Sequence, residues 1–126
     1  MNKRHGEGAA RFAERRRRED EAPRLNTEIP KLETLKLEVE ARRSGSVVSE
    51  ASHIRRIVVD NAPALFMLPC GDPSCRDGGH DITHPVMYAL RAGQTTFDGE
   101  DTCHGQTGSA TCSRILHYVG KATYRE

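Results

Sequence analysis

The sequence predicts an α+β fold, in which a small antiparallel sheet carries one helix packed on a face, behind a flexible N-terminal arm. Two observations predict this fold class. Apolar and charged residues alternate strictly over residues 35–42, which is the period of a strand with one wet face. Residues 83–93 combine a helix start signal, one apolar face and a closing glycine. Several strands around a single helix favour an antiparallel sheet.

The N-terminal arm is assigned to residues 1–28 and the folded domain to residues 29–126. The arm has almost no apolar side chains beyond Phe12 and Leu25. Residues 9–21 are mostly good helix formers, but without an apolar stripe they predict a marginal helix or disorder. We therefore expect a flexible charged tail that becomes helical on binding.

The domain is expected to contain five extended segments. Residues 35–42 form the alternating strand, and residues 54–60 form a second extended stretch. Residues 64–68 are apolar at every position, which predicts a strand buried on both faces at the centre of the sheet. A short strand is expected at residues 94–97. Residues 114–124 are rich in residues that favour strands and predict the last one.

One helix is predicted between the third and fourth of these strands. Thr83 is a suitable N-cap, and Gly93 lies just past the expected end. Its apolar residues at i, i+3 and i+4 form one face for packing on a sheet. They are Val86, Ala89 and Leu90.

The composition indicates that the domain needs disulfide bonds or a bound metal to be stable. Hydrophobic residues make up 36% of the chain and aromatic residues 5%, with no Trp. Small domains with so little core often depend on a metal or disulfides. No apolar run approaches the roughly 18 residues of a membrane span, and the charged first residues lack the apolar region of a secretory signal. We therefore expect a cytoplasmic protein whose thiols stay reduced.

Four cysteines can provide such a stabilising site. Cys70 and Cys75 enclose four residues, Cys103 and Cys112 enclose eight, and 27 residues separate the two pairs. Glycine-containing turns lie within each pair, and each pair adjoins the end of a predicted strand. Thiolates are soft, easily deprotonated ligands, and a closed tetrahedral zinc site takes four of them. The sequence therefore predicts one structural Zn²⁺ held by these four cysteines, and a metal-free domain that is largely unfolded.

This arrangement resembles zinc-ribbon-type domains, in which two turn-borne cysteine pairs at the ends of β-strands clamp one zinc ion. The resemblance is one of class, and it covers the chain from Cys70 to about Tyr118. The spacing departs from that of the class, because a ribbon pair usually encloses two residues and the pairs here enclose four and eight. The resemblance implies a metal with a structural role.

Other interpretations of the cysteines remain open. His80 or His104 lies close enough in the sequence to replace one sulfur in a three-cysteine, one-histidine site, and His84 also lies nearby. Two disulfides or free buried thiols are further alternatives, although a reducing compartment disfavours disulfides. Four thiolates also suit iron.

No catalytic motif accompanies the cysteines. Four thiolates close a zinc site, whereas a catalytic zinc keeps one position open. The sequence has no Cys-x-x-Cys, no His-Glu-x-x-His and no glycine-rich phosphate loop. The acidic cluster at residues 98–101 is interpreted as a solvated turn. We therefore expect a protein that is not an enzyme.

Charge is distributed unevenly along the chain. Residues 1–18 carry seven Lys and Arg against two acidic residues, whereas residues 53–126 carry seven against eight. The near-neutral domain with few aromatic residues favours protein contact, so the expected function is a protein-interaction module that serves as an adaptor or regulatory accessory subunit. The alternative function is nucleic-acid binding, in which a run of arginines contacts the phosphates. Three acidic residues follow this run directly. The run consists of Arg15, Arg16, Arg17 and Arg18.

Overall fold

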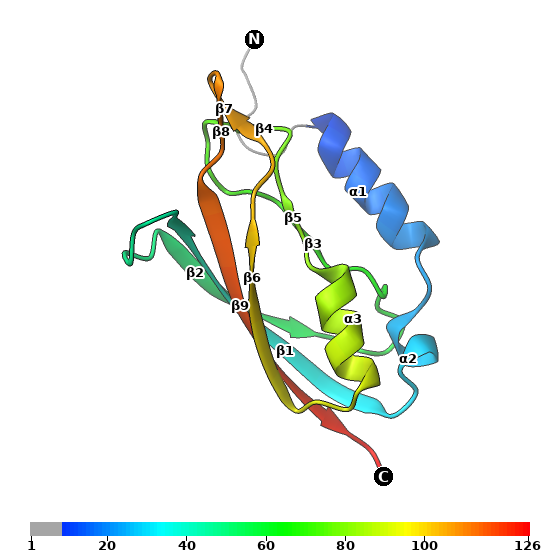
Figure 1. The fold of residues 1–126 in the computed structure, drawn as a ribbon. Helices are drawn as coiled ribbons and strands as arrows, with labels where there is room; N and C mark the ends of the chain where they lie inside the picture. Colours follow the sequence, from blue (N-terminus) through cyan, green and yellow to red (C-terminus); the bar gives the residue numbers. More distant parts are fainter. Residues whose placement is uncertain (1–8) are drawn as a thin grey trace.

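The computed structural model describes residues 9–126 and confirms the α+β class. The main sheet has four strands in the order β2-β1-β9-β6, each antiparallel to its neighbours. The helices lie on one side of this sheet, and a small three-stranded sheet lies at one end of it (Figure 1). The main strands are β1 (Leu32–Arg43), β2 (Ala51–Ile57), β6 (Thr96–Thr102) and β9 (Arg114–Tyr124).

Strand β1 contains the alternating segment, and its apolar positions enter the core. Alternate side chains of a strand point to opposite faces of the sheet, so the charged residues between them lie on the outer face. The strand is longer than the predicted 35–42 because β9 pairs with it from residue 32 to residue 43. The buried residues of the alternating segment are Leu35, Leu37 and Val39.

The remaining main strands match the predictions to different degrees. Strand β9 covers the predicted residues 114–124, whereas β2 lies three residues earlier than predicted and ends at Ile57, opposite Leu35. The interpretation of residues 98–101 as a solvated turn is wrong, because they lie within β6. Strand β9 offers these residues a continuous pairing partner, and the exposed side chains of Asp98 and Glu100 alternate with less exposed positions.

The predicted helix is confirmed as α3 (Thr83–Arg91), and Gly93 follows it at φ +73°. The prediction of Thr83 as its N-cap is wrong, since Ile82 occupies that position. The Thr83 hydroxyl instead accepts a hydrogen bond from the Phe66 backbone N–H, with N and O 2.7 Å apart. The buried side chains of α3 are Val86, Met87, Ala89 and Leu90. All of these except Ala89 belong to the same hydrophobic core as the inner residues of β1.

The prediction of a central strand at residues 64–68 is wrong. Only β3 (Met67–Leu68) is extended, and it pairs with β5 (His80–Asp81) in a separate two-stranded sheet. The Phe66 backbone oxygen accepts a hydrogen bond from Ile82 N, so this segment lies against the start of α3. Its apolar side chains fill the core from the helix side of the molecule, which explains an apolar run without a place in the main sheet.

Two helices precede β1, namely α1 (Ala9–Glu21) and α2 (Leu25–Glu28). Residues 1–8 of the predicted arm lie outside the described residues. Leu25 is fully buried in the core, and its backbone N–H donates to Ala62 O at 2.7 Å. Leu25 of α2, which the sequence placed in the arm, therefore packs in the core, while the domain boundary and the flexibility of the preceding residues stay predictions.

Candidate metal centre

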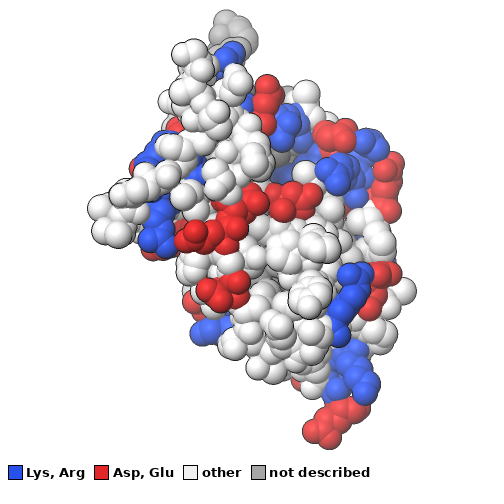
Figure 2. All heavy atoms as spheres, viewed as in Figure 1, with Lys and Arg blue, Asp and Glu red and all other residues white. Residues whose placement is uncertain are grey.

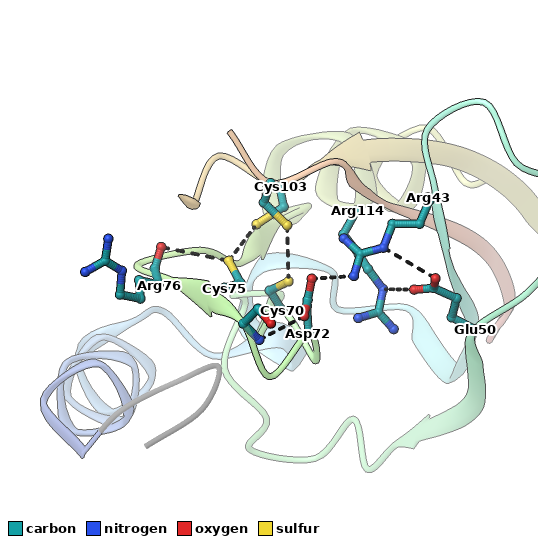
Figure 3. A network of polar contacts seen from close by, with 10 residues as sticks. Arg43, Glu50, Cys70, Asp72, Cys75, Arg76, Cys103 and Arg114 are labelled. Carbon is teal, nitrogen blue, oxygen red and sulfur yellow. Dashed lines mark hydrogen bonds and ion pairs between the residues drawn. The ribbon is translucent and has the colours of Figure 1, made fainter. Parts of the chain in front are cut away.

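The four cysteine sulfurs lie together at the end of the main sheet where β6 stops and β9 begins. Each Sγ lies within 4.8 Å of the other three. The Sγ atoms of Cys70 and Cys112 are 4.0 Å apart, and those of Cys75 and Cys103 are 3.7 Å apart. None of the four residues is more than 3% exposed. They form a candidate metal site composed of the residues that the sequence predicted (Figure 3).

A tight turn over residues 71–74 brings Cys70 and Cys75 together. Asp72 organises this turn, because its Oδ1 accepts the Ser74 backbone N–H at 2.9 Å and its backbone oxygen accepts the Cys75 N–H at 3.0 Å. Such side chain-to-backbone bonds are the reason aspartate favours turns. The turn delivers Cys75 into the short strand β4 (Cys75–Arg76).

A hairpin occupies the eight residues between Cys103 and Cys112. Its strands are β7 (Gln106–Thr107) and β8 (Ala110–Thr111), with Gly108 at φ +64° in the turn between them. The Cys112 backbone N–H donates to Gly105 O at 2.8 Å, which closes the base of the hairpin. Strand β4 pairs with β7, so one three-stranded sheet connects the two cysteine pairs. The wide spacing of the second pair is therefore the length of an inserted hairpin.

Two glycines allow the backbone to approach the sulfurs closely. A Cβ added at Gly105 would lie 2.5 Å from Cys75 Sγ and 2.6 Å from Arg76 O. A Cβ at Gly78 would lie 2.5 Å from Cys75 Sγ and also collide with Cys103 Sγ. Gly105 lies in one of the glycine-containing turns that the sequence predicted between the paired cysteines. The sequence assigned no role to Gly78, since close approach to a sulfur leaves no local signal in the chain.

The surroundings change the acidity of the thiols in opposite directions. Burial raises the pKa of Cys70 to about 11, and burial also raises the pKa of Cys75. Burial acts on Cys103 as well, but the backbone N–H groups of Gly105 and Gly79 donate to its sulfur and leave its pKa lowered. The Gly105 N atom lies 3.3 Å from that sulfur. A bound divalent cation would supply the positive charge that full ionisation of the cluster requires.

Ionic side chains hold the first turn in place (Figure 3). Arg43, the last residue of β1, contacts the buried carboxylate of Asp72, and its Nε lies 3.4 Å from Glu50. Burial opposes ionisation of Asp72, but the hydrogen bonds from the Ser74 N–H and from Arg43 lower its pKa. The carboxylate therefore stays charged and fixes the turn to β1.

A second arginine, Arg114, is buried next to the same network. Its Nε lies 3.2 Å from Glu50 Oε1, close enough for an ion pair but without hydrogen-bond geometry, so within residues 9–126 this nitrogen has no hydrogen-bond partner. Its backbone oxygen accepts the Cys103 N–H at 2.9 Å. The two guanidinium groups are balanced by the carboxylates of Asp72 and Glu50, so this network positions the cysteine turn and adds no net charge beside it. The sequence did not predict either arginine, because only the tertiary fold brings them to the cysteines.

The histidine alternatives are not supported by the arrangement of side chains. His80 is buried, but its Nδ1 lies 2.9 Å from Asp101 Oδ2 and it is not part of the cluster. His84 and His104 are exposed. The disulfide alternative is also not supported, since the four thiols are free and the 3.7 Å between the sulfurs of Cys75 and Cys103 far exceeds the roughly 2.05 Å of a disulfide bond.

The arginine run lies on α1 and is partly neutralised there. Arg17 pairs with Glu14 at 2.6 Å and Glu21 at 3.0 Å, and Arg15 pairs with Glu19 at 3.4 Å. Figure 2 shows cationic and anionic side chains intermingled on this side of the molecule. The helix approaches the metal-site loop through another arginine, since Arg11 Nη2 donates to Gly78 O at 3.2 Å.

The chain matches no known protein family, and no curated protein or solved structure matches it. The fold and the site therefore define its class by themselves. It is an α+β protein with an antiparallel main sheet and a buried four-cysteine candidate metal site. Within the described part of the chain, no helix is both long and apolar enough to cross a bilayer.

Proposed function

We propose that this protein is a zinc-stabilised interaction module without catalytic activity, in which Cys70, Cys75, Cys103 and Cys112 hold one structural Zn²⁺. The observation that carries the proposal is the enclosure of the four sulfurs in one buried cluster, all within 4.8 Å. Free cysteines behave as small hydrophobes when they pack singly. Convergence of four from distant parts of the chain is what a thiolate metal site requires.

The sulfur separations support a tetrahedral ion. A Zn–S distance of about 2.3 Å places the four sulfurs of a tetrahedral site about 3.8 Å apart. The Cys75–Cys103 and Cys70–Cys112 sulfur separations, 3.7 and 4.0 Å, lie on either side of that value. Tetrahedral iron has the same ligand preference. Metal analysis of the purified protein therefore has to identify the ion.

The local backbone supports a ribbon-like interpretation of the site. Cys70 and Cys103 each accept an N–H from the residue two positions later, Asp72 and Gly105 respectively. Both pairs are thus borne on turns with backbone donors directed at the sulfur. The three-stranded sheet β4-β7-β8 joins the two turns, as expected of a ribbon-like arrangement.

The closure of the site supports a structural role for the metal. All four ligand positions are filled by protein sulfurs, and the sulfurs are buried. A catalytic zinc keeps a position for water or substrate and usually has a carboxylate base beside it. The buried carboxylate closest to the cysteines in sequence, Asp72, is held by Arg43 and the turn backbone. The zinc would therefore contribute folding free energy and no chemistry.

The outer face of the main sheet supports the interaction role. The described helices lie on the opposite side of the sheet (Figure 1), so this face remains open within residues 9–126. It carries charged residues of β1 together with Ile54, which is 51% exposed. A polar surface with isolated apolar anchors resembles the composition of transient protein interfaces. The ion pairs along α1 favour this role over nucleic-acid binding, because they cancel part of the field that phosphates would meet.

The metal proposal is tested by elemental analysis and native mass spectrometry of the purified chain, before and after chelation. We expect one zinc per chain, and loss of amide dispersion in the NMR spectrum when the zinc is removed. Cys103→Ser should lose the metal, whereas His104→Gln, which changes an exposed neighbour, should retain it. A folded, dispersed spectrum after complete removal of the metal would contradict the proposal.

The interaction role and its alternative differ in their salt dependence. Binding to nucleic acid through the arginine run should weaken steeply with salt and disappear when Arg15, Arg16, Arg17 and Arg18 are replaced by glutamine. A protein partner on the outer sheet face should be insensitive to those substitutions. Salt-sensitive oligonucleotide binding that the glutamine variant loses would favour the alternative.

A further inference from the structure

Three basic residues lie side by side on the outer face of the main sheet. The strand register places Lys36 of β1 directly opposite Arg56 of β2 on one side and Lys121 of β9 on the other. Directly opposite residues in antiparallel strands have Cβ atoms about 5 Å apart and share one face. We call Arg56, Lys36 and Lys121 the basic row.

Like charges placed directly opposite each other destabilise a sheet, so the basic row needs an explanation. In the next two rows of the same face, the β1 glutamates lie opposite uncharged residues of β2, Ile54 and Ser52. The basic row does not follow that pattern. One atom, Glu38 Oε2, lies 3.3 Å from Lys36 Nζ and 3.6 Å from Lys121 Nζ. A single carboxylate oxygen thus serves both lysines.

The third member of the row has no compensating anion. The Arg56 side chain forms no ion pair or hydrogen bond with any residue between 9 and 126. Its guanidinium is exposed and keeps all its donors available. The row therefore carries an excess of positive charge that the described part of the protein does not neutralise.

The basic row lines a groove of about 920 Å³. The groove exists because β2 ends at Ile57, opposite Leu35, so the first residues of β1 have no strand beside them on that side. Arg125 adds a fourth cation to the lining, and the acidic residues in the lining are Glu33 and Asp60. The Asp60 carboxylate already accepts a hydrogen bond from Asn26 at 3.1 Å. The lining as a whole is cationic.

The groove also offers hydroxyl donors and an apolar wall. Thr34 Oγ1 and Thr123 Oγ1 are 2.6 Å apart, so one hydroxyl hydrogen is used between them and the other stays available for a ligand oxygen. Ile57, Val58 and Val59 form the apolar wall, and Val58 is 78% exposed although it lines the groove. A volume near the upper end of the usual range for ligand pockets suits a small organic molecule.

We propose that this groove binds a small organic phosphate, with the phosphate across the basic row and the organic portion against Val58. A phosphate monoester carries close to two negative charges and three terminal oxygens, which match three neighbouring cations better than the single charge of a carboxylate does. Lys and Arg are both common phosphate ligands. The site is separate from the four cysteines and requires only that the domain be folded.

The test uses the full, metal-loaded chain in phosphate-free buffer, with phenyl phosphate as the probe. Phenyl phosphate at millimolar concentration should shift the backbone NMR signals of Lys36, Val58 and Lys121. Inorganic phosphate should bind more weakly, and phenol should not bind. The double substitution Lys36→Gln with Lys121→Gln should weaken binding of phenyl phosphate by about tenfold or more.

Arg42→Gln is the matched control, because Arg42 lies six residues along the same strand and face, about 20 Å from Lys36. It should bind phenyl phosphate as the unchanged protein does. The proposal is overturned if the probe leaves the groove signals unshifted, if the lysine double variant binds as well as Arg42→Gln, or if inorganic phosphate binds as tightly as phenyl phosphate. Shifts of the groove signals by a DNA oligonucleotide but not by phenyl phosphate would also overturn it. None of these outcomes bears on metal content, so failure here leaves the zinc proposal untouched.

Discussion

Replacement of Gly105 by alanine tests the close packing of backbone on the cysteine sulfurs. The new Cβ would lie 2.5 Å from Cys75 Sγ, 2.6 Å from Arg76 O and 2.6 Å from Gly78 Cα. A carbon and a sulfur at van der Waals contact are more than 1 Å further apart than this, by a rough estimate from contact distances. Two of the three colliding atoms belong to the backbone, so the clash cannot be relieved by a rotamer change.

Overpacking of this kind usually costs about 1–3 kcal/mol. Because two of the colliding atoms belong to the backbone, we expect the destabilisation by Gly105→Ala to lie at the upper end of this range, about 3 kcal/mol. If the strain falls on the metal-loaded state, metal affinity should decrease roughly a hundredfold or more. Gly71→Ala is the matched control, since Gly71 also lies in a cysteine turn but has no atom within 4 Å of an added Cβ. It should be neutral or slightly stabilising.

The assay is competition for zinc with a chromophoric chelator, together with denaturant unfolding of both variants at one fixed free-zinc concentration. Fixed free zinc is necessary because the bound ion contributes to the apparent stability. Gly105→Ala should bind zinc more weakly and unfold at lower denaturant than Gly71→Ala. Equal zinc affinity and equal unfolding midpoints in the two variants would refute the argument from close approach.

Three further predictions follow from side chains in and around the core. Leu25→Ala should lower the free energy of unfolding by about 2–5 kcal/mol because Leu25 is fully buried. Phe12→Ala should change it little. Denaturant melts of the two variants decide whether α2 belongs to the domain. Burial, with Asp101 and Asp98 nearby, raises the pKa of Tyr118, so the unfolded chain ionises first and stability should fall as pH rises above about 10. Tyr118→Phe should flatten that decline in melts across alkaline pH, and an unchanged slope would contradict the assignment. Glu50→Ala should lower the free energy of unfolding by about 1–2 kcal/mol because it leaves Arg114 buried without its nearest anion. This value is already reduced for the partial exposure of Glu50. Unchanged thermal stability would show that the pair contributes nothing.

Local patterns in the sequence predicted much of the secondary structure. The alternation in 35–42 is the direct signature of a strand with one buried face, and the structure places it in the centre of the main sheet as β1. The helix at Thr83–Arg91 was predicted from its apolar spacing and closing glycine, and the strand at Arg114–Tyr124 from its strand-favouring residues, all of which are local signals. The four cysteines were recognisable as a cluster because soft ligands in two turn-borne pairs are rare without a metal.

Contacts between distant parts of the chain explain the two secondary-structure predictions that were wrong. The apolar segment 64–68 satisfies its buried side chains from the helix side, and hydrophobicity alone does not distinguish that position from the centre of a sheet. The acidic segment 98–101 became a strand because β9 supplied a pairing partner, against its own weak strand preference. In both cases a contact between distant residues outweighed a local preference.

The sequence by itself determined the class of fold, the strands β1 and β9, the helix α3 and the four cysteines of the candidate site. Only the tertiary structure decided which glycines must stay small, how Arg43 and Arg114 reach the cysteine turns, and that Arg56, Lys36 and Lys121 meet in one row. The physical reason is the separation along the chain of the residues that interact. Periodicity, turn chemistry and ligand type are written into neighbouring residues, whereas close approach and charge placement depend on the register between strands that are distant in the chain.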